Sequence, residues 1–171
     1  RLLGSPLDRI FSVQQGSTNE GMPFDFVLWD LAGVLMGRPV YDLAAQMRDR
    51  ATPPRQQIAC YDTSLYIDDL HIADNHKAAA LIAVEAAEGF ARGHRAFKVK
   101  VGRGARHMPL AEGTERDIDV IRAVRSAVGD DATIMVDANN GYNLNLAKRV
   151  LAETADCRIY WLEEPFHEDA I

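Results

Sequence analysis

The sequence predicts an α/β protein in which parallel β-strands alternate with α-helices. Three observations support this fold class: strand-like and helical segments alternate after residue 53, hydrophobic residues make up 47% of the 171 positions, and polar residues gather where each strand ends. Alternating β/α units form parallel sheets with right-handed crossovers. The pattern fits either half of a (β/α)₈ barrel or a doubly wound sheet, and both place ligand sites at the carboxyl ends of the strands.

The first 50 residues are predicted to be mainly helical. Ser5 as N-cap and Pro6 as the first helical residue indicate a short helix, and the polar residues 14–21 indicate a loop after it. Apolar residues at helical spacing predict a second helix that begins near Phe24 and ends before Gly37.

A proline-containing breaker at 52–54 separates this part from the alternating segment. Strands are expected at residues 57–61, 96–101, 133–139 and 159–165. Helices are expected at residues 77–90, 114–128 and 143–155. Asp74 and Thr114 are the expected N-caps of the first two helices, and Gly129 ends the second.

Two lysines share one face of the strand at 96–101. Period-two alternation places Lys98 and Lys100 opposite an apolar face that is suited to packing on helices. At a rise of ~3.3 Å per residue the two side chains start about 6.6 Å apart, and their charges repel by roughly 2.5 kcal/mol at an effective dielectric constant of ~20. This repulsion is expected to lower the pKa of one lysine, which makes a neutral amine accessible as a base.

Carboxylates end the next two strands, where Asp137 and Glu163 occupy corresponding positions. Because Mg²⁺ prefers oxygen ligands, two carboxylates on neighbouring strands fit a magnesium site that still lacks one ligand. Glu164 is expected to point to the other face unless the strand has already ended. The alternative is that Lys98 and Lys100 extend to solvent while the carboxylates cap the following helices.

The composition argues against nucleic acid and membranes as partners. The formal net charge is −6 without a basic cluster, whereas phosphate binding requires grouped lysines and arginines. No apolar run reaches the roughly 18 residues that span a bilayer. Cys60 and Cys157 lack a metal-binding spacing, so both are expected to be reduced core residues in a cytoplasmic protein. The chain begins at Arg1 and ends at Ile171 without a capping signal, so a longer protein is expected.

Five motifs follow one another along the chain: LLGSPLD at 2–8, FVLWDLAGVLMGRPVYDL at 26–43, KVK at 98–100, MVDANNGY at 135–142 and WLEEP at 161–165. Together they resemble the mandelate racemase and muconate lactonizing enzyme branch of the enolase superfamily, and its acid-sugar dehydratases in particular. Each motif alone is weak, but five in this order are highly specific.

The resemblance implies a (β/α)₇β barrel of the TIM type with an α+β capping domain. Residues 1–52 would be the helical C-terminal part of the capping domain, and residues 53–171 the first half of the barrel. The resemblance also implies Mg²⁺-assisted removal of the proton α to a carboxylate through an enediolate intermediate. Because an open half barrel exposes two sheet edges, the 171 residues alone are expected to be inactive.

Positions within the motifs imply roles for the polar strand residues. By this resemblance Lys100 would be the catalytic acid and base, and Lys98 would contact the substrate carboxylate and assist catalysis. Asp137 and Glu163 would be Mg²⁺ ligands.

Three further residues have weaker assignments. Asn139 would line the site near the metal and contact the substrate, and Glu164 would lie behind the metal ligands and pair with Lys98. His167 would stand at the mouth of the barrel, where it could contact the substrate.

The loop at 102–113 is longer than is usual in this family and begins with Arg103, Arg106 and His107. A solvated loop is the simpler interpretation. Contact with an anionic, polyhydroxy substrate is the alternative.

Several functions fit these residues. The favoured reaction is dehydration of an acid sugar, a small-molecule carboxylate, by a homo-oligomeric enzyme. Racemisation, epimerisation and cycloisomerisation are alternatives within the same superfamily. A Schiff-base aldolase using Lys100 or Lys98 is a further enzymatic alternative, and a non-catalytic carboxylate- or metal-binding homologue is the alternative of another class.

Overall fold

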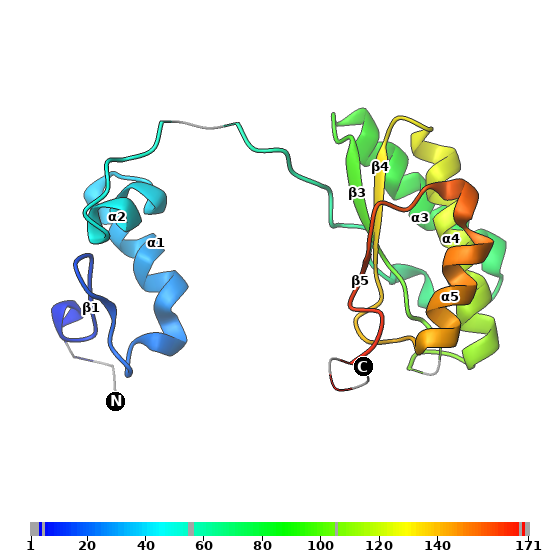
Figure 1. Ribbon diagram of the computed structural model, residues 1–171, viewed down its shortest axis with the longest axis horizontal. Helices are drawn as coiled ribbons and strands as arrows, with labels where there is room; N and C mark the ends of the chain where they lie inside the picture. Colours follow the sequence, from blue (N-terminus) through cyan, green and yellow to red (C-terminus); the bar gives the residue numbers. More distant parts are fainter. Residues whose placement is uncertain (1–3, 5, 55–56, 105, 168, 170–171) are drawn as a thin grey trace. The chain divides into compact units, whose positions relative to one another are not determined.

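The computed structural model describes residues 4, 6–54, 57–104, 106–167 and 169. The chain divides into two compact units, Arg1–Ile58 and Ala59–Ile171, referred to below as the N-terminal and the C-terminal unit (Figure 1). The assignment of residues 1–52 to a capping domain and of 53–171 to half a barrel stays a prediction.

The N-terminal unit combines short helices with a small hairpin. Its elements are the 3₁₀ helices η1 (Leu7–Arg9) and η2 (Met22–Phe24), the strands β1 (Phe11–Ser12) and β2 (Gly16–Ser17), and the helices α1 (Asp25–Met36) and α2 (Val40–Met47). The predicted first helix is only one 3₁₀ turn, which begins after Pro6, while the predicted cap Ser5 lies outside the described residues. The predicted loop at 14–21 contains β2, because Gly16 adopts a φ of +76° and lets the chain turn back on β1.

The predicted second helix is confirmed as α1. It ends at Gly37, whose left-handed φ of +63° places its amide near the last carbonyl groups of the helix. Its inner face packs on the hairpin, where the rings of Phe11 and Trp29 meet edge to face at 5.1 Å.

The C-terminal unit is a parallel sheet with helices packed on one side (Figure 1). Its elements are η3 (Asp68–His71), α3 (Asn75–Ala91), β3 (Ala96–Lys100), α4 (Leu110–Val128), β4 (Thr133–Asp137), α5 (Leu144–Glu153), η4 (Ala155–Cys157) and β5 (Leu162–Glu163). The strand order is β3-β4-β5. Three strands alternate with helices as predicted, and within the described ranges the sheet does not close into a barrel.

The predicted strand at 57–61 is wrong. Residues 57–61 form no strand; the chain first meets β3 at Asp62, through one isolated parallel bridge to Phe97, and again where the Lys100 amide donates to the Leu65 carbonyl at 2.9 Å. The Asp62 carboxylate accepts hydrogen bonds from the backbone amide and the hydroxyl of Ser64 at 2.9 and 2.6 Å. This local turn competes with the strand ladder, so the pairing stays brief.

The predicted strand at 159–165 is shorter than expected, because β5 covers only Leu162–Glu163. Glu164 has a positive φ angle of 41°, which takes the backbone out of the extended region directly after β5.

The helix ends agree with the sequence in two cases and differ in one. Asp74 caps α3 by accepting from the Lys77 amide at 2.9 Å, and Gly129 ends α4, both as predicted. Thr114, the predicted cap, lies inside α4, since the helix already begins after Pro109. The Thr114 hydroxyl donates to the Leu110 carbonyl at 2.8 Å instead of capping.

Alternation along β3 is confirmed and produces the two faces of the sheet. Phe97 and Val99 are fully buried against the helices, whereas Lys98 and Lys100 lie partly exposed on the opposite face.

None of the helices in the described part of the chain is both long and apolar enough to cross a bilayer. Both cysteines were predicted to be buried in the core. Cys157 is buried, but Cys60 is exposed, and both thiols are free.

Replacing Asn143 with alanine is expected to destabilise the protein by ~0.5–2 kcal/mol. Asn143 caps α5 by accepting a hydrogen bond from the Leu146 amide at 3.0 Å, and alanine leaves that amide without this partner. Urea denaturation measures the change. Asn145→Ala is the matched control, since Asn145 is exposed within α5 and alanine favours the helix there. Equal stability of Asn143→Ala and the unsubstituted protein would contradict the assigned cap.

Candidate functional site

Polar side chains from three strands meet at one edge of the sheet. The parallel register pairs Lys100 with Asp137 across β3 and β4, and Asp137 with Glu163 across β4 and β5. Lys98 lies two residues before Lys100 on the same face. The register thus brings the ends of the three strands together, as their order in the sequence predicts.

These four side chains form one chain of ion pairs. The Lys98 ammonium lies 2.8 Å from Glu163 Oε1 and 3.2 Å from Asp137 Oδ2. The Lys100 ammonium lies 2.5 Å from the same Asp137 oxygen. The structure therefore brings together the two lysines and the two carboxylates that the sequence places at the strand ends, and their chemical roles stay predictions.

The electrostatics differ from the repulsion expected between the lysines. The hydrogen bond to Glu163 raises the pKa of Lys98 above its ordinary value; burial opposes this effect and the Asp137 carboxylate reinforces it. Two carboxylates lie 3.2 and 2.8 Å from the Lys98 ammonium, whereas the two lysine side chains start about 6.6 Å apart. The attraction of the carboxylates therefore outweighs the repulsion from Lys100.

Asp137 is the most buried member of the cluster, with a side chain only 2% exposed. Burial opposes its ionisation, but hydrogen bonds from Lys100, the Asn139 amide and Lys98 outweigh that cost and hold the pKa of Asp137 below its usual range. Asp137 is therefore ionised at neutral pH and available as an anionic oxygen ligand.

Asn139 and Glu164 extend the cluster, although not in the expected pairing. Asn139 Oδ1 accepts from the Lys100 ammonium at 2.6 Å, and Asn139 Nδ2 donates to Glu164 Oε2 at 3.1 Å. The predicted pair of Lys98 with Glu164 is wrong, because Lys98 binds Glu163. Strand β5 ends at Glu163, and the positive φ of Glu164 turns the chain so that its carboxylate meets Asn139.

The segments after β4 and β5 hold each other in this arrangement. Asn139 and Asn140 adopt positive φ angles of 42° and 63°, which asparagine tolerates better than most residues. The Asn140 amide donates to the Glu164 carbonyl at 2.8 Å, and the Tyr142 amide donates to the Pro165 carbonyl at 2.9 Å. Strained backbone of this kind is often found at functional sites.

His167 lies apart from the ion-pair chain. It is exposed, and its Nδ1 lies 3.4 Å from the Asp169 carboxylate. It does not line the pocket described below, so the structure offers no support for its predicted contact with a substrate.

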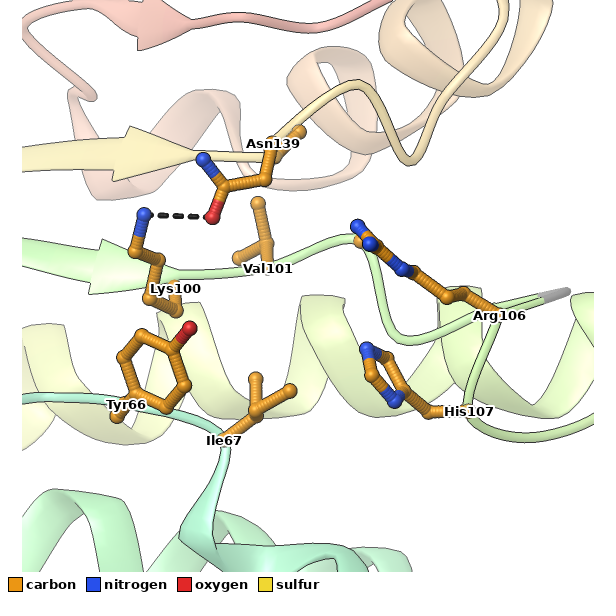
Figure 2. A pocket seen from close by; sticks show the side chains of 9 residues that line it. Tyr66, Ile67, Lys100, Val101, Arg106, His107 and Asn139 are labelled. Atoms are coloured by element: carbon orange, nitrogen blue, oxygen red, sulfur yellow. Dashed lines mark hydrogen bonds between the residues drawn. The ribbon is translucent and has the colours of Figure 1, made fainter.

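A pocket opens beside Lys100 and Asn139 (Figure 2). Its volume of about 220 Å³ is below the ~300–1,000 Å³ of typical small-molecule sites. Besides the ends of β3 and β4, it is lined by Tyr66 and Ile67, and by Arg106 and His107 from the loop after β3; these lining residues appear together in Figure 2. No sequence pattern pointed to Tyr66, since it lies outside every periodic segment.

The loop after β3 was predicted to be either solvated or in contact with a substrate. Arg103 fits neither prediction, because its side chain is buried and bound to carboxylates of the protein. Its side chain is fully buried. Its Nε and Nη2 donate to Asp69 at 3.0 and 2.6 Å, and its Nη1 donates to Asp117 Oδ1 at 2.8 Å. Arg103 is a structural residue that links three segments of the C-terminal unit.

This buried network fixes the end of β3. Arg103 Nη1 also donates to the Lys100 carbonyl at 2.9 Å. Asp117 Oδ2 accepts from the Gly102 amide and from the Tyr142 hydroxyl, both at 2.8 Å. Burial raises the pKa of Asp117 despite the opposing charge of Arg103.

The donor set fits part of a site for a hard divalent cation. Asp137 and Glu163 supply two carboxylates from neighbouring strands in register, both bound by the Lys98 ammonium. Across the described residues, no group of three or more His, Cys, Asp or Glu side chains lies close enough to hold a metal ion. The two carboxylates would therefore need a further ligand from elsewhere.

Residues 81–171 match the sequence profile of a family described as "Enolase C-terminal domain-like". Two similar solved structures come from Geobacillus. A galacturonate dehydratase from Geobacillus sp., complexed with D-galacturonate and 5-keto-4-deoxy-D-galacturonate, is 46% identical with a TM-score of 0.73. A mandelate racemase/muconate lactonizing protein from Geobacillus sp. Y412MC10, complexed with magnesium/tartrate, is 48% identical with a TM-score of 0.75.

A curated relative extends the comparison to another reaction. D-galactarolactone cycloisomerase of Agrobacterium fabrum is 33% identical over 143 residues, which are 82% of this chain and 32% of that protein. The alignments with both Geobacillus structures cover 97% of this chain and 43% of theirs. The chain thus spans less than half the length of each of these three proteins.

Proposed function

The chain belongs to the enolase superfamily, in its mandelate racemase and muconate lactonizing enzyme branch, and from this premise we propose that it is part of an Mg²⁺-dependent acid-sugar dehydratase. The reaction would begin with removal of the proton α to the substrate carboxylate. The observation that carries the proposal is the chain of ion pairs that joins Lys98, Lys100, Asp137 and Glu163 at one edge of the sheet.

Lys100 is the proposed base. Its amine nitrogen lies at the pocket wall, with Asp137 and Asn139 as hydrogen-bond partners that hold its position. In its neutral form this nitrogen accepts the α proton. The removed proton and the hydroxyl of the β carbon leave together as one water molecule, and the resulting enol becomes a 2-keto acid.

Lys98 is the proposed partner of the substrate carboxylate. Its pKa is raised by Glu163, so it is an ammonium group at neutral pH and attracts an anion. The Lys98 side chain is only 11% exposed. This burial strengthens the attraction, because the local dielectric constant is lower than that of water. Lys98 would thereby place the α carbon of the substrate beside Lys100.

Asp137 and Glu163 are the proposed metal ligands, with a further ligand supplied by another part of the complete protein. Bound Mg²⁺ would stabilise the negative charge that develops on the substrate carboxylate. Glu164 would keep Asn139 in place through their hydrogen bond at 3.1 Å.

D-galacturonate is the proposed substrate type. The galacturonate dehydratase from Geobacillus sp. is 46% identical to this chain, and its structure contains D-galacturonate together with 5-keto-4-deoxy-D-galacturonate. That pair of compounds differs by one water molecule lost from the α and β carbons, which is the reaction derived above. Cycloisomerisation is the alternative reaction, since D-galactarolactone cycloisomerase is also similar to this chain.

We also propose that the active protein is a longer, cytoplasmic homo-oligomer. The relatives are more than twice as long as this chain, and its cysteines are free. The 171 residues alone are therefore expected to form no product from D-galacturonate. Turnover by this piece at the rate of the complete protein would contradict that part of the proposal.

Removing divalent metal is expected to abolish turnover by the complete protein. D-galacturonate is incubated with the protein, and the product with a keto group at the carbon α to the carboxylate is measured before EDTA, after EDTA and after added Mg²⁺. The proposal predicts product, loss of product and recovery in that order. Undiminished product formation in EDTA would contradict a metal-dependent reaction.

Substrate that returns with deuterium from D₂O but without keto product would indicate a racemase or epimerase. Mg²⁺-dependent binding without either change would indicate a non-catalytic homologue.

A further inference from the structure

The pocket beside Lys100 has a basic end that the proposed chemistry does not use. Figure 2 shows Lys100 and Asn139 at one end of the pocket, and Arg106 with His107 at the other, their side chains turned towards the first pair. Both basic residues come from the loop that follows β3. The pocket therefore continues from the proposed base to two nitrogen-rich side chains.

Arg106 differs from the other arginines of the C-terminal unit. Each of those donates a hydrogen bond or forms an ion pair within the described residues, as Arg92 does with Glu88 at 3.7 Å. In that part of the chain the guanidinium of Arg106 has no protein partner, and no carboxylate lines the pocket. A guanidinium without a protein counter-charge at a pocket wall is suited to binding ligand oxygen atoms.

The loop that carries Arg106 is held in place rather than freely solvated. Gly104 and Met108 form a parallel bridge across it, and the Arg106 amide donates to the Gly104 carbonyl at 2.8 Å. At the base of the loop, the buried Arg103 is fixed by Asp69 and Asp117. Arg106 is thus presented from a braced turn, which lowers the entropic cost of binding.

We propose that Arg106, assisted by His107, binds the oxygen atoms of an acid sugar at the end remote from the carbon that Lys100 deprotonates. This inference rests on the proposed function, since it assumes a sugar acid in the pocket. It assigns one end of the substrate to Lys98 and Lys100, and the other to the loop after β3. Arg106 is a binding residue in this account and takes no part in proton transfer.

Binding is measured by titration calorimetry on the complete protein with Mg²⁺, in a Lys100→Met background that does not consume the ligand. Two ligands are compared: D-galacturonate, which has the remote end, and D-glycerate, which keeps the carboxylate and α carbon but lacks that end. Adding Arg106→Met is expected to weaken D-galacturonate binding by about 10- to 100-fold, the effect of losing a charged hydrogen bond. Binding of D-glycerate should change less than about twofold.

Two controls separate the inference from its alternatives. Arg92→Met removes an exposed arginine of α3 and should leave the binding of both ligands unchanged, whereas Arg106→Lys should retain part of the affinity for D-galacturonate. An unchanged affinity for D-galacturonate in Arg106→Met, or an equal loss for both ligands, would overturn the assignment of the remote end. Turnover of D-galacturonate by the unsubstituted protein tests the proposed function separately, so the two failures are distinguishable.

Discussion

Replacing Lys100 with methionine is expected to lower the turnover number of the complete protein on D-galacturonate by about 10²- to 10⁴-fold, the usual contribution of a positioned general base. Methionine keeps the length of the side chain and loses the nitrogen that is proposed to accept the proton. The Michaelis constant should change much less, because the proposed contact of Lys98 with the substrate carboxylate is retained. Steady-state kinetics of the purified variant measure both quantities.

The control for this experiment is Lys148→Met, which removes an exposed lysine of α5 and should leave both constants unchanged. Circular dichroism and the urea midpoint show whether the Lys100 variant is folded. A folded Lys100→Met protein with the turnover number of the unsubstituted protein would exclude Lys100 as the base.

Replacing Arg103 with methionine is expected to destabilise the protein by ~3–5 kcal/mol, as for other broken buried ion pairs. The variant leaves Asp69 and Asp117 buried without the guanidinium that binds both. Arg116 lies 3.6 Å from Asp69 and compensates only one of the two carboxylates. Urea denaturation measures the loss of stability.

The stability deficit of Arg103→Met should depend on pH. Burial already raises the pKa of Asp117, and loss of the positive charge raises it further. A carboxyl group with a raised pKa binds more protons in the folded than in the unfolded state, so the stability of the variant rises as the pH falls through that raised pKa towards the lower pKa of the unfolded chain. The deficit relative to the unsubstituted protein should therefore narrow in acid and widen towards neutral pH.

Arg158→Met is the control for the buried pair. Arg158 lies 2.8 Å from Asp130, but both side chains are mainly exposed, and such pairs contribute only ~0.2–1 kcal/mol. Equal losses of stability in the two variants would contradict the structural role of Arg103.

The convergence of the site residues could be predicted because it depends on regular structure. Alternation along β3 places Lys98 and Lys100 on one face, and a parallel strand order brings the strand ends to one edge. Neither step requires knowledge of contacts between distant residues. Local strand geometry and strand order were sufficient.

The contacts of the loop after β3 could not be predicted in the same way. Arg103 binds Asp69, which lies 34 residues earlier in the chain, and no periodic pattern connects the two. The sequence shows an arginine next to two glycines, which reads as a solvated loop. Its burial depends on how η3 and α4 pack around the end of β3.

The missed details at strand ends have a common cause. Strand pairing stops earlier than the hydrophobic pattern predicts. Near Asp62 it is interrupted by a hydrogen bond between the Asp62 side chain and the Ser64 amide, and after β5 it is interrupted by the positive φ angle of Glu164. Hydrophobic pattern does not report these local backbone conformations. The pairing of Lys98 was missed for the same reason, since it depends on where β5 ends.

The central claim is that the complete protein removes the proton next to the carboxylate of an acid sugar by means of Lys100. The most direct test uses D-galacturonate that carries tritium on that carbon and measures label released into water in the presence of Mg²⁺. The account predicts that every labelled molecule converted to keto product releases its tritium into water, and that this release is slowed by about 10²- to 10⁴-fold in Lys100→Met. Keto product that retains the tritium, or undiminished release by the Lys100 variant, would contradict it.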